Sequence, residues 1–235
     1  MKNFFWISRL YFKRNFLHLA NYLLIGLPLI FIIAFHMMAN IAPEADFTFI
    51  AIPLILAFQF FSADVTAGWL HEDLKGPTGA RLLVSGNDSR VFYISVITTS
   101  WLFSLLMGAL LIPITSIFFN IEWVNIPLSF LALAFLSLIT QIVGVLIFYF
   151  TKDKKAAGKI GYLFGEIMIG IAIFPSAFSI TFLENITKYF PVGLGEQLAH
   201  ATNFADAILP TAILIGIIIV LSAIVLVVEK RKNYV

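Results

Sequence analysis

Six long apolar stretches constrain this chain more than any other feature of its sequence. Each is long enough for a helix to cross the hydrocarbon core of a bilayer, which takes about 20 residues. Backbone N–H and C=O groups must be paired within lipid, and the stretches lack the alternation of barrel strands, so we expect helices. The stretches lie near residues 19–39, 48–68, 91–119, 126–150, 158–182 and 207–228. The sequence therefore predicts an all-α integral membrane protein with six transmembrane helices.

The composition agrees with this class. Hydrophobic residues make up 60% of the chain and charged residues only 12%, which is too few for the charged surface of a soluble domain. The sequence contains no cysteine, which excludes disulfides, thiol nucleophiles and cysteine-based metal sites. Neither an internal repeat nor a linker is evident, so we predict one domain over residues 1–235.

The basic residues fall almost entirely on one side of the predicted membrane. Fourteen of the 15 lie in the N-terminus, in the second and fourth loops, or in the C-terminus, and Lys188 is the exception. Loops rich in Lys and Arg remain in the cytoplasm, so both termini and the loop at residues 71–90 are predicted to be cytoplasmic. An even number of spans requires both termini on one side, which agrees.

Residues 1–18 precede the first span and are basic and aromatic. On a helical wheel Lys2, Arg9 and Lys13 fall within about 40° of one another, and apolar residues occupy the other side. This pattern predicts an amphipathic helix that lies on the inner leaflet with its bases near anionic headgroups. A plain basic flank of the first span is the alternative.

Catalytic and nucleotide-binding motifs are absent from the sequence. His71-Glu72 begins like the zinc-protease pattern H-E-x-x-H, but Lys75 occupies the closing position. No G-x-S-x-G elbow occurs, and Gly158-Lys159 lacks the rest of a P-loop. We therefore predict no catalytic residue, no metal ligand and no bound cofactor, with any ATP and Mg held by a partner.

The loop HEDLKGPTGARLLVSGNDSR, residues 71–90, is the most polar part of the chain. Gly76-Pro77 should end the second span, and Thr78 is a suitable N-cap for a short helix. That helix would offer Leu82 and Leu83 to the cytosol. Because exposed apolar side chains on a cytosolic loop need a cover, a partner protein is expected there.

This loop resembles the first cytoplasmic loop of the permease subunits of type-2 ATP-binding-cassette exporters. In that family an acidic stretch precedes a short coupling helix, which docks in a groove of a separate ATPase subunit. Two departures exist: Ala80 stands where the family often has an acid, and Gly86-Asn87-Asp88 replaces its usual proline. By this resemblance the ATPase-coupling residues are Glu72, Asp73, Thr78, Arg81, Leu82, Leu83, Ser85 and Arg90.

The resemblance covers the whole chain. Residues 183–206 are too polar to span and too apolar for an ordinary loop, and they look like the external re-entrant helices of that family. Pro191 and Glu196 would form an external gate there. The resemblance implies a bacterial plasma membrane protein that pairs with a second permease copy or paralogue and with two ATPase copies. Membrane lipid, but no nucleic acid, would be a further partner.

Glu166 is the most unusual residue of the predicted spans, because it lies near mid-membrane in the fifth. A carboxylate there costs about 2.5–3.5 kcal/mol on insertion scales and faces a cavity or a partner. It would either contact cargo in the translocation path or bond to Gln141, to Thr140 or to a second protomer. Gln141 and Gln59 are further candidates for that path. Gly161 and Gly165 form a small-xxx-small face that permits close helix packing.

We thus expect an ATP-driven exporter permease for a hydrophobic or amphipathic cargo, such as an antimicrobial peptide, a toxin or a drug. Export of a lipid-linked glycan or another lipid is an alternative, as is a non-transporting sensor or immunity scaffold. A membrane enzyme would need catalytic groups gathered at one depth, whereas the histidines are scattered at 18, 36, 71 and 200.

Overall fold

The computed structural model describes residues 2–41, 48–76, 89–178 and 181–232. Within these ranges the regular structure is helical, and no strand is present. The elements are α1 (Lys2–Leu17), α2 (Leu19–Ile41), α3 (Thr48–Phe58), η1 (Gln59–Phe61), α4 (Ser62–Leu70), η2 (His71–Lys75), α6 (Ser89–Phe119), α7 (Ile126–Phe150), α8 (Lys154–Phe178), α9 (Thr181–Thr187), α10 (Pro191–His200) and α11 (Phe204–Lys232).

Six helical stretches within the described residues are long and apolar enough to cross a membrane. They run over Phe4–Met38, Ile50–Lys75, Val91–Phe119, Ile126–Phe150, Lys154–Ile173 and Phe204–Arg231. For the described residues, the prediction of an all-α protein with six helices long and apolar enough to cross a membrane is therefore confirmed. The fifth of these helices, α8, begins at Lys154, four residues before the predicted boundary. Its first turns therefore include basic residues that the sequence analysis placed in the preceding loop.

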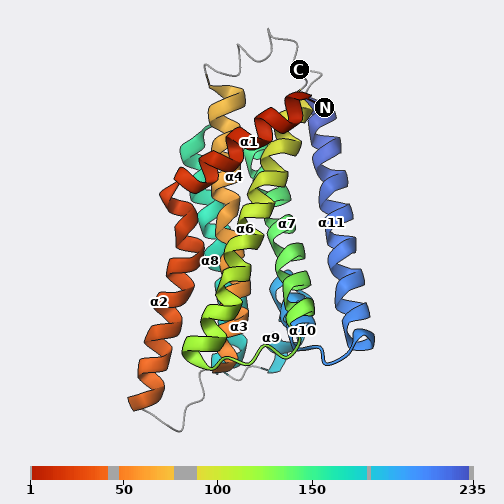
Figure 1. The fold of residues 1–235 in the computed structure, drawn as a ribbon. Coiled ribbons are helices and arrows are strands. Elements are labelled where there is room, and N and C mark those ends of the chain that lie inside the picture. The colour runs from red at the N-terminus through yellow and green to blue at the C-terminus, as the bar shows by residue number, and fades with distance from the viewer. Residues whose placement is uncertain (1, 42–47, 77–88, 179–180, 233–235) are drawn as a thin grey trace.

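The long helices run side by side, and the two ends of the bundle differ (Figure 1). The start of α1 and the end of α11 lie at one end of the bundle, which we call the terminal end (Figure 1). Helix α1 crosses the terminal end at a steep angle to the long helices, and α9 and α10 lie at the opposite end (Figure 1). The helix is interrupted at His18, between α1 and α2. Helix α1 is therefore a separate helix, although the apolar stretch continues into α2.

Helix α7 is the centre of the bundle, and α4, α6, α10 and α11 all pack against it. Asn125 caps its start by accepting a hydrogen bond from the backbone N–H of Leu128, with Pro127 in the first turn, where its missing N–H does no harm. Two large apolar clusters of buried side chains surround it: one centres on α3, α7 and α10, and the other on α4 and the terminal end of α6 and α7.

The second span is one buried helical stretch of mixed geometry. It begins as α3, tightens to a 3₁₀ turn at η1, continues as α4 and ends in the wider π-helical turn η2. Gly76, whose backbone is extended, follows η2 and ends the stretch, as the Gly-Pro pair predicted. Irregular turns of this kind mark hinges and functional positions in helices.

Helix α8 packs on α4 and η1 through two glycines. A Cβ added at Gly161 would lie 2.6 Å from the Cα atom of Asp64, and one at Gly165 would lie 2.9 Å from the ring of Phe61. No ordinary side chain fits at such distances, so the two helices approach more closely than larger residues allow. The small-xxx-small face is thus used inside this chain, between α8 and the second span.

Candidate functional site

An ionic cluster of four side chains joins three elements at the terminal end. The Arg14 guanidinium on α1 donates to the carboxylates of Glu72 and Asp73 on η2, and its Nη1 lies 2.7 Å from the Asp73 Oδ2. The Lys154 ammonium, at the start of α8, forms an ion pair with Glu72. Arg14 to Asp73 and Lys154 to Glu72 connect residues 59 and 82 positions apart in the chain. The cluster therefore fixes α1, the end of the second span and α8 relative to one another.

Two aromatic side chains, Tyr11 and Trp69, contact this ionic cluster on its buried side. The hydroxyl of Tyr11 donates to Asp73 Oδ2 over 2.6 Å. The Arg14 guanidinium carbon lies 5.0 Å from the centre of the Trp69 ring, at the distance of a cation–π contact. Tyr11 stacks on the same ring, with 5.9 Å between centroids. Because Tyr11 and Trp69 are almost fully buried, the cluster stands on the apolar core and not on solvent alone.

A second set of contacts holds η2 to the end of α7. The Lys75 ammonium donates to the Thr151 carbonyl oxygen over 2.8 Å and lies 4.7 Å from the Phe148 ring centre. The His71 Nε2 and Thr151 Oγ1 atoms are 2.7 Å apart. The last carbonyls of α7 thereby gain donors, which a helix end requires. With the ionic cluster, these contacts anchor η2 to α1, to the start of α8 and to the end of α7.

The anchored turn η2 directly precedes the predicted coupling helix. Of the coupling residues, Glu72 and Asp73 lie in η2, and Arg90 lies in the first turn of α6, its side chain outside the description. The other five, Thr78, Arg81, Leu82, Leu83 and Ser85, lie outside the described residues. The structure thus brings the two acids together at the base of the loop, and it binds both to bases of this chain.

This pairing changes what Glu72 and Asp73 can do. The resemblance makes them ATPase-coupling residues, but Arg14 and Lys154 of this chain already contact them. A carboxylate has about four acceptor positions, and the Glu72 side chain is 37% exposed, so it retains capacity for a further donor. Their role in coupling therefore stays a prediction, now joined to a structural role.

Arg14 and Lys154 were missed as site residues. One signal was available for Arg14: on the helical wheel of α1 it lies about 100° from Lys13, off the arc that the other bases share. A base away from the basic arc of an interfacial helix points toward the protein. Nothing in the sequence distinguishes Lys154 from its basic neighbours.

Gln141 lies in a buried polar network between α4, α6 and α7. Its Nε2 donates to Ser62 Oγ over 2.9 Å and to Ser104 Oγ over 3.3 Å, and its Oε1 accepts from Thr66. Each of these side chains is buried. The network pairs the polar atoms of the bundle interior with one another, so Gln141 connects three spans.

Gln59 is also fully buried, at the 3₁₀ turn η1, but its situation differs from that of Gln141. Its Nε2 and Oε1 atoms have no hydrogen-bond partner among the described residues. A Cβ added at Gly108 of α6 would lie 2.8 Å from the Gln59 Nε2 atom, so the amide occupies the space that this glycine leaves. Gln59 and Gln141 are therefore both interior residues, but among the described residues only Gln141 has hydrogen-bond partners.

Glu166 lies on the outer face of α8 and its side chain is exposed. The buried face of this helix carries Gly161 and Gly165, whereas Tyr162 and Ile167 are exposed beside Glu166. The suggested partners within this chain are engaged elsewhere: Gln141 in the polar network, and the Thr140 hydroxyl with the Leu136 carbonyl oxygen at 2.8 Å. Glu166 is 12 residues from either end of α8, about 18 Å along the axis.

Pro191 and Glu196 both lie on α10, five positions apart. Pro191 occupies the first turn of the helix, where its fixed backbone suits a helix start. Gly193 permits the tight approach of α9, since a Cβ there would lie 2.2 Å from the Thr187 carbonyl oxygen. Burial raises the pKa of the Glu196 carboxyl from its ordinary value of 4.5 to about 7. Burial likewise lowers the pKa of His200, at the end of α10.

Within the described part of the chain, no group of three or more His, Cys, Asp or Glu side chains is placed to hold a metal ion. Searches against models of protein families, curated proteins and solved structures found no significant match for this chain.

Proposed function

We propose that this chain is the membrane-spanning permease subunit of an ATP-driven exporter. A separate ATPase would dock on the loop that follows η2, and a second permease would complete the transport path. The cargo would be hydrophobic or amphipathic, such as a peptide toxin or a drug, in keeping with an apolar bundle that carries few charges. Both termini and the docking loop would lie in the cytoplasm.

The ionic cluster is the observation that carries this proposal. A transporter must pass the movement of its ATPase to the spans, which requires a stiff connection at the base of the docking loop. Glu72 and Asp73 provide it through Arg14 and Lys154, which belong to two other elements. Hydrogen bonds to charged groups contribute about 1.5–3 kcal/mol each, so several together resist a pull on the loop. A surface loop without this function needs no such anchorage.

The exposed Glu166 supports the second permease. A carboxylate on a lipid-facing surface at mid-membrane is costly, so such residues face a partner or a water-filled path. Since the outer face of α8 carries Glu166, pairing of two chains through this face would remove the carboxylates from lipid. The same face would then border the path between the two permeases.

Docking of the ATPase is tested by changing the loop. We expect Leu82→Asp combined with Leu83→Asp to abolish co-purification of the ATPase and cargo-stimulated ATP hydrolysis. Burial of one Leu side chain contributes about 1.5–3 kcal/mol, and both contacts would be lost. The measurement is ATP hydrolysis by the complex reconstituted in vesicles, with ATP-dependent cargo uptake into inverted vesicles.

The matched control carries two Asp substitutions at an exposed pair of the opposite end, Thr202→Asp with Asn203→Asp, which should leave hydrolysis unchanged. Full cargo-stimulated hydrolysis by the Leu82/Leu83 variant would refute docking on this loop. The variant must still reach the membrane and elute as a single species for the comparison to count.

The orientation is tested by labelling, which is simple because the chain has no cysteine of its own. Single Cys substitutions at Glu122 and Asn203, both exposed away from the terminal end, should react with an impermeant thiol reagent in intact cells. A Cys at Lys155, exposed near the ionic cluster, should react only after the cells are opened. Labelling of position 155 in intact cells would reverse the proposed topology.

A further inference from the structure

Helix α1 turns one side toward the protein and a basic side away from it. The protein side carries Ile7, Tyr11 and Asn15, each at most 4% exposed, and the helix packs mainly on α6. Arg9 and Lys13 lie on the opposite side of the helix, and both are exposed. The side of α1 that faces away from its bases is therefore covered by protein and not by lipid.

Two rows of large apolar side chains flank these bases, and all of them are between 37% and 75% exposed. At about 100° per residue, the two rows lie roughly 60° to either side of the bases. One row consists of Phe5, Phe12 and Phe16, and the other of Trp6, Leu10 and Leu17. The bases and the two rows together are the outer face of α1. So many exposed apolar groups on one helix of 16 residues need an apolar cover.

The position of α1 in the fold indicates what this cover is. Helix α1 is followed almost directly by α2, whose apolar sequence is long enough to enter the membrane. It crosses the terminal end at a steep angle to the long helices (Figure 1). The outer face of α1 therefore meets the membrane surface, where aromatic side chains are favoured and long basic side chains extend to the level of the headgroups.

The bases of this face are not compensated by acids of the neighbouring helices. Helices α1, α2 and α6 contain no Asp or Glu. Among the described residues no ion pair involves Arg9 or Lys13. The acids nearest to α1, Glu72 and Asp73, are bound within the ionic cluster. Both bases therefore remain available to an anionic partner.

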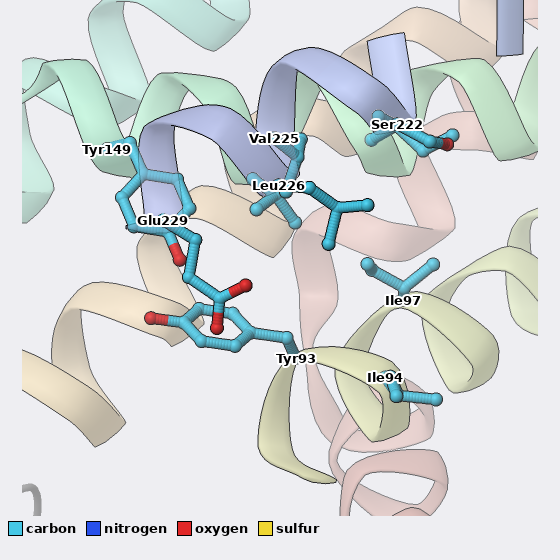
Figure 2. A pocket seen from close by; sticks show the side chains of 10 residues that line it. Tyr93, Ile94, Ile97, Tyr149, Ser222, Val225, Leu226 and Glu229 are labelled. Atoms are coloured by element: carbon cyan, nitrogen blue, oxygen red, sulfur yellow. The ribbon is translucent and has the colours of Figure 1, made fainter. Parts of the chain in front are cut away.

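The other charged groups of the terminal end add to this positive charge. Glu229 is directed into a pocket between α6, α7 and α11, and Figure 2 shows its carboxylate between the side chains of Tyr93 and Tyr149. Asp64 packs against α8, and Asp153 directly precedes that helix. Further bases at this end are Arg90, Lys152, Lys155, Lys159, Lys230 and Arg231. The described part of the terminal end is thus basic, which favours an anionic membrane surface.

We propose that the outer face of α1 binds anionic phospholipids, with their phosphate groups at Arg9 and Lys13 and the two apolar rows among the acyl chains. The same helix carries Arg14, which holds Glu72 and Asp73 in η2. Binding of the headgroups therefore stiffens η2 through α1, and the charge of the membrane controls how firmly the following loop is held. This proposal does not depend on the chain being a permease.

The lipid preference is tested with the purified full chain in vesicles of equal parts phosphatidylglycerol and phosphatidylcholine. Native mass spectrometry after gentle extraction should show that the wild type retains phosphatidylglycerol preferentially. Arg9→Gln with Lys13→Gln should lower this preference about thirtyfold, since each base near an anionic surface contributes about fivefold. Lys152→Gln with Lys155→Gln removes two exposed bases beside Asp153 at the same end, and should change it little. Equal retention of both lipids by the wild type, or an equal loss in this control, would overturn the proposal.

Two further measurements separate a membrane surface from other anionic partners. Glycerol 3-phosphate carries a headgroup phosphate without acyl chains, so millimolar concentrations should not displace phosphatidylglycerol. Displacement would assign the bases to a soluble phosphate compound instead. If the Arg9 and Lys13 variant keeps its lipid preference but no longer binds the ATPase subunit, the face belongs to a protein partner and the assignment to lipid is wrong.

Hydrogen exchange of the backbone amides of residues 71–76 tests the link to η2. In nanodiscs, phosphatidylglycerol should slow this exchange severalfold in the wild type relative to phosphatidylcholine alone. The Arg9 and Lys13 variant should exchange equally fast in both lipids. Arg14→Ala should also lose the difference while it keeps the lipid preference, because it breaks the connection and not the lipid site. Lipid binding that left the exchange of wild-type η2 unchanged would refute the link.

Discussion

At the terminal end of the bundle acidic side chains lie against basic ones, whereas at the opposite end Glu196 is half-buried without a paired base among the described residues. Arg14 and Lys154 link Glu72 and Asp73 to two other elements. Among the described residues no ion pair involves Glu196, and burial dominates its environment. The terminal end therefore combines apolar packing with ion pairs, whereas the environment of Glu196 is mainly apolar. The two ends should respond differently to pH and to the loss of a single side chain.

The largest loss of stability is expected for a substitution in α8, the helix that runs between the two ends of the bundle (Figure 1). Gly161→Ala should destabilise the fold by about 3 kcal/mol or more, because its Cβ would lie 2.6 Å from the Asp64 backbone. Gly158→Ala is the matched control, since nothing lies within 4 Å of a Cβ at that position. Because alanine has a higher helix propensity than glycine, this substitution should be neutral or stabilising. Thermal unfolding in detergent measures both. Equal melting temperatures would mean that α8 does not pack on α4 through this face.

The next effect belongs to Glu196. Its pKa, raised from 4.5 to about 7, favours the neutral carboxyl in the folded chain, a difference of about 3 kcal/mol. This stability is fully present below pH 4.5, declines as the pH rises and is lost above about 7. Glu196→Gln cannot ionise, so its stability relative to the wild type should rise between pH 5 and pH 8. Parallel curves for the two proteins over this range would contradict burial of the carboxyl.

Loss of Arg14 tests the charged end. Arg14→Ala removes contacts to two carboxylates and to the Trp69 ring, and should cost about 2 kcal/mol. Lys13→Ala, an exposed neighbour on α1, should cost little. If the cluster also transmits movement from the loop, Arg14→Ala should lower cargo-stimulated ATP hydrolysis while the ATPase still binds. Identical stability of the two variants would mean that charge does not hold this end.

The smallest effect is expected for Lys154. Its side chain is 56% exposed, so its ion pair with Glu72 is largely screened by water, and Lys154→Ala should cost about 1 kcal/mol or less. Lys155→Ala serves as the control at the next position. The cost for Lys154 should decrease as salt is added, because exposed ion pairs are screened. A cost that exceeded that of Arg14→Ala would reverse the roles of the two bases.

Hydropathy was sufficient to predict the long helices, because a span must be apolar over its whole length. The sequence did not predict the contacts that join them. The partners of Glu72 lie 58 and 82 positions away, and nothing in local sequence specifies such distances. The small-residue face of α8 was recognised, but its partner was not, since a glycine pattern does not name the helix that packs on it. The η1 turn was likewise invisible, because its residues Gln59–Phe61 fit a regular helix equally well.

The direction in which the Glu166 side chain points could not be predicted from the sequence either. The sequence placed this carboxylate near mid-membrane but left its partner open, inside the bundle or on another chain. Only the rotation of α8 decides between these, and that rotation follows from Gly161 and Gly165 contacting the second span. The side chain then points outward. The direction of a charged residue thus depends on which small residues face the bundle.

The amide of Gln59 has one consequence for the evolution of this chain. A buried amide without a hydrogen bond costs about 1–3 kcal/mol, and methionine would fill a similar volume without that cost. Gln59→Met should therefore raise the melting temperature. If the same variant transports less cargo, selection has kept a less stable chain because the amide acts in the translocation path. If transport is unaltered, position 59 is one where a mutation can increase stability without loss of function.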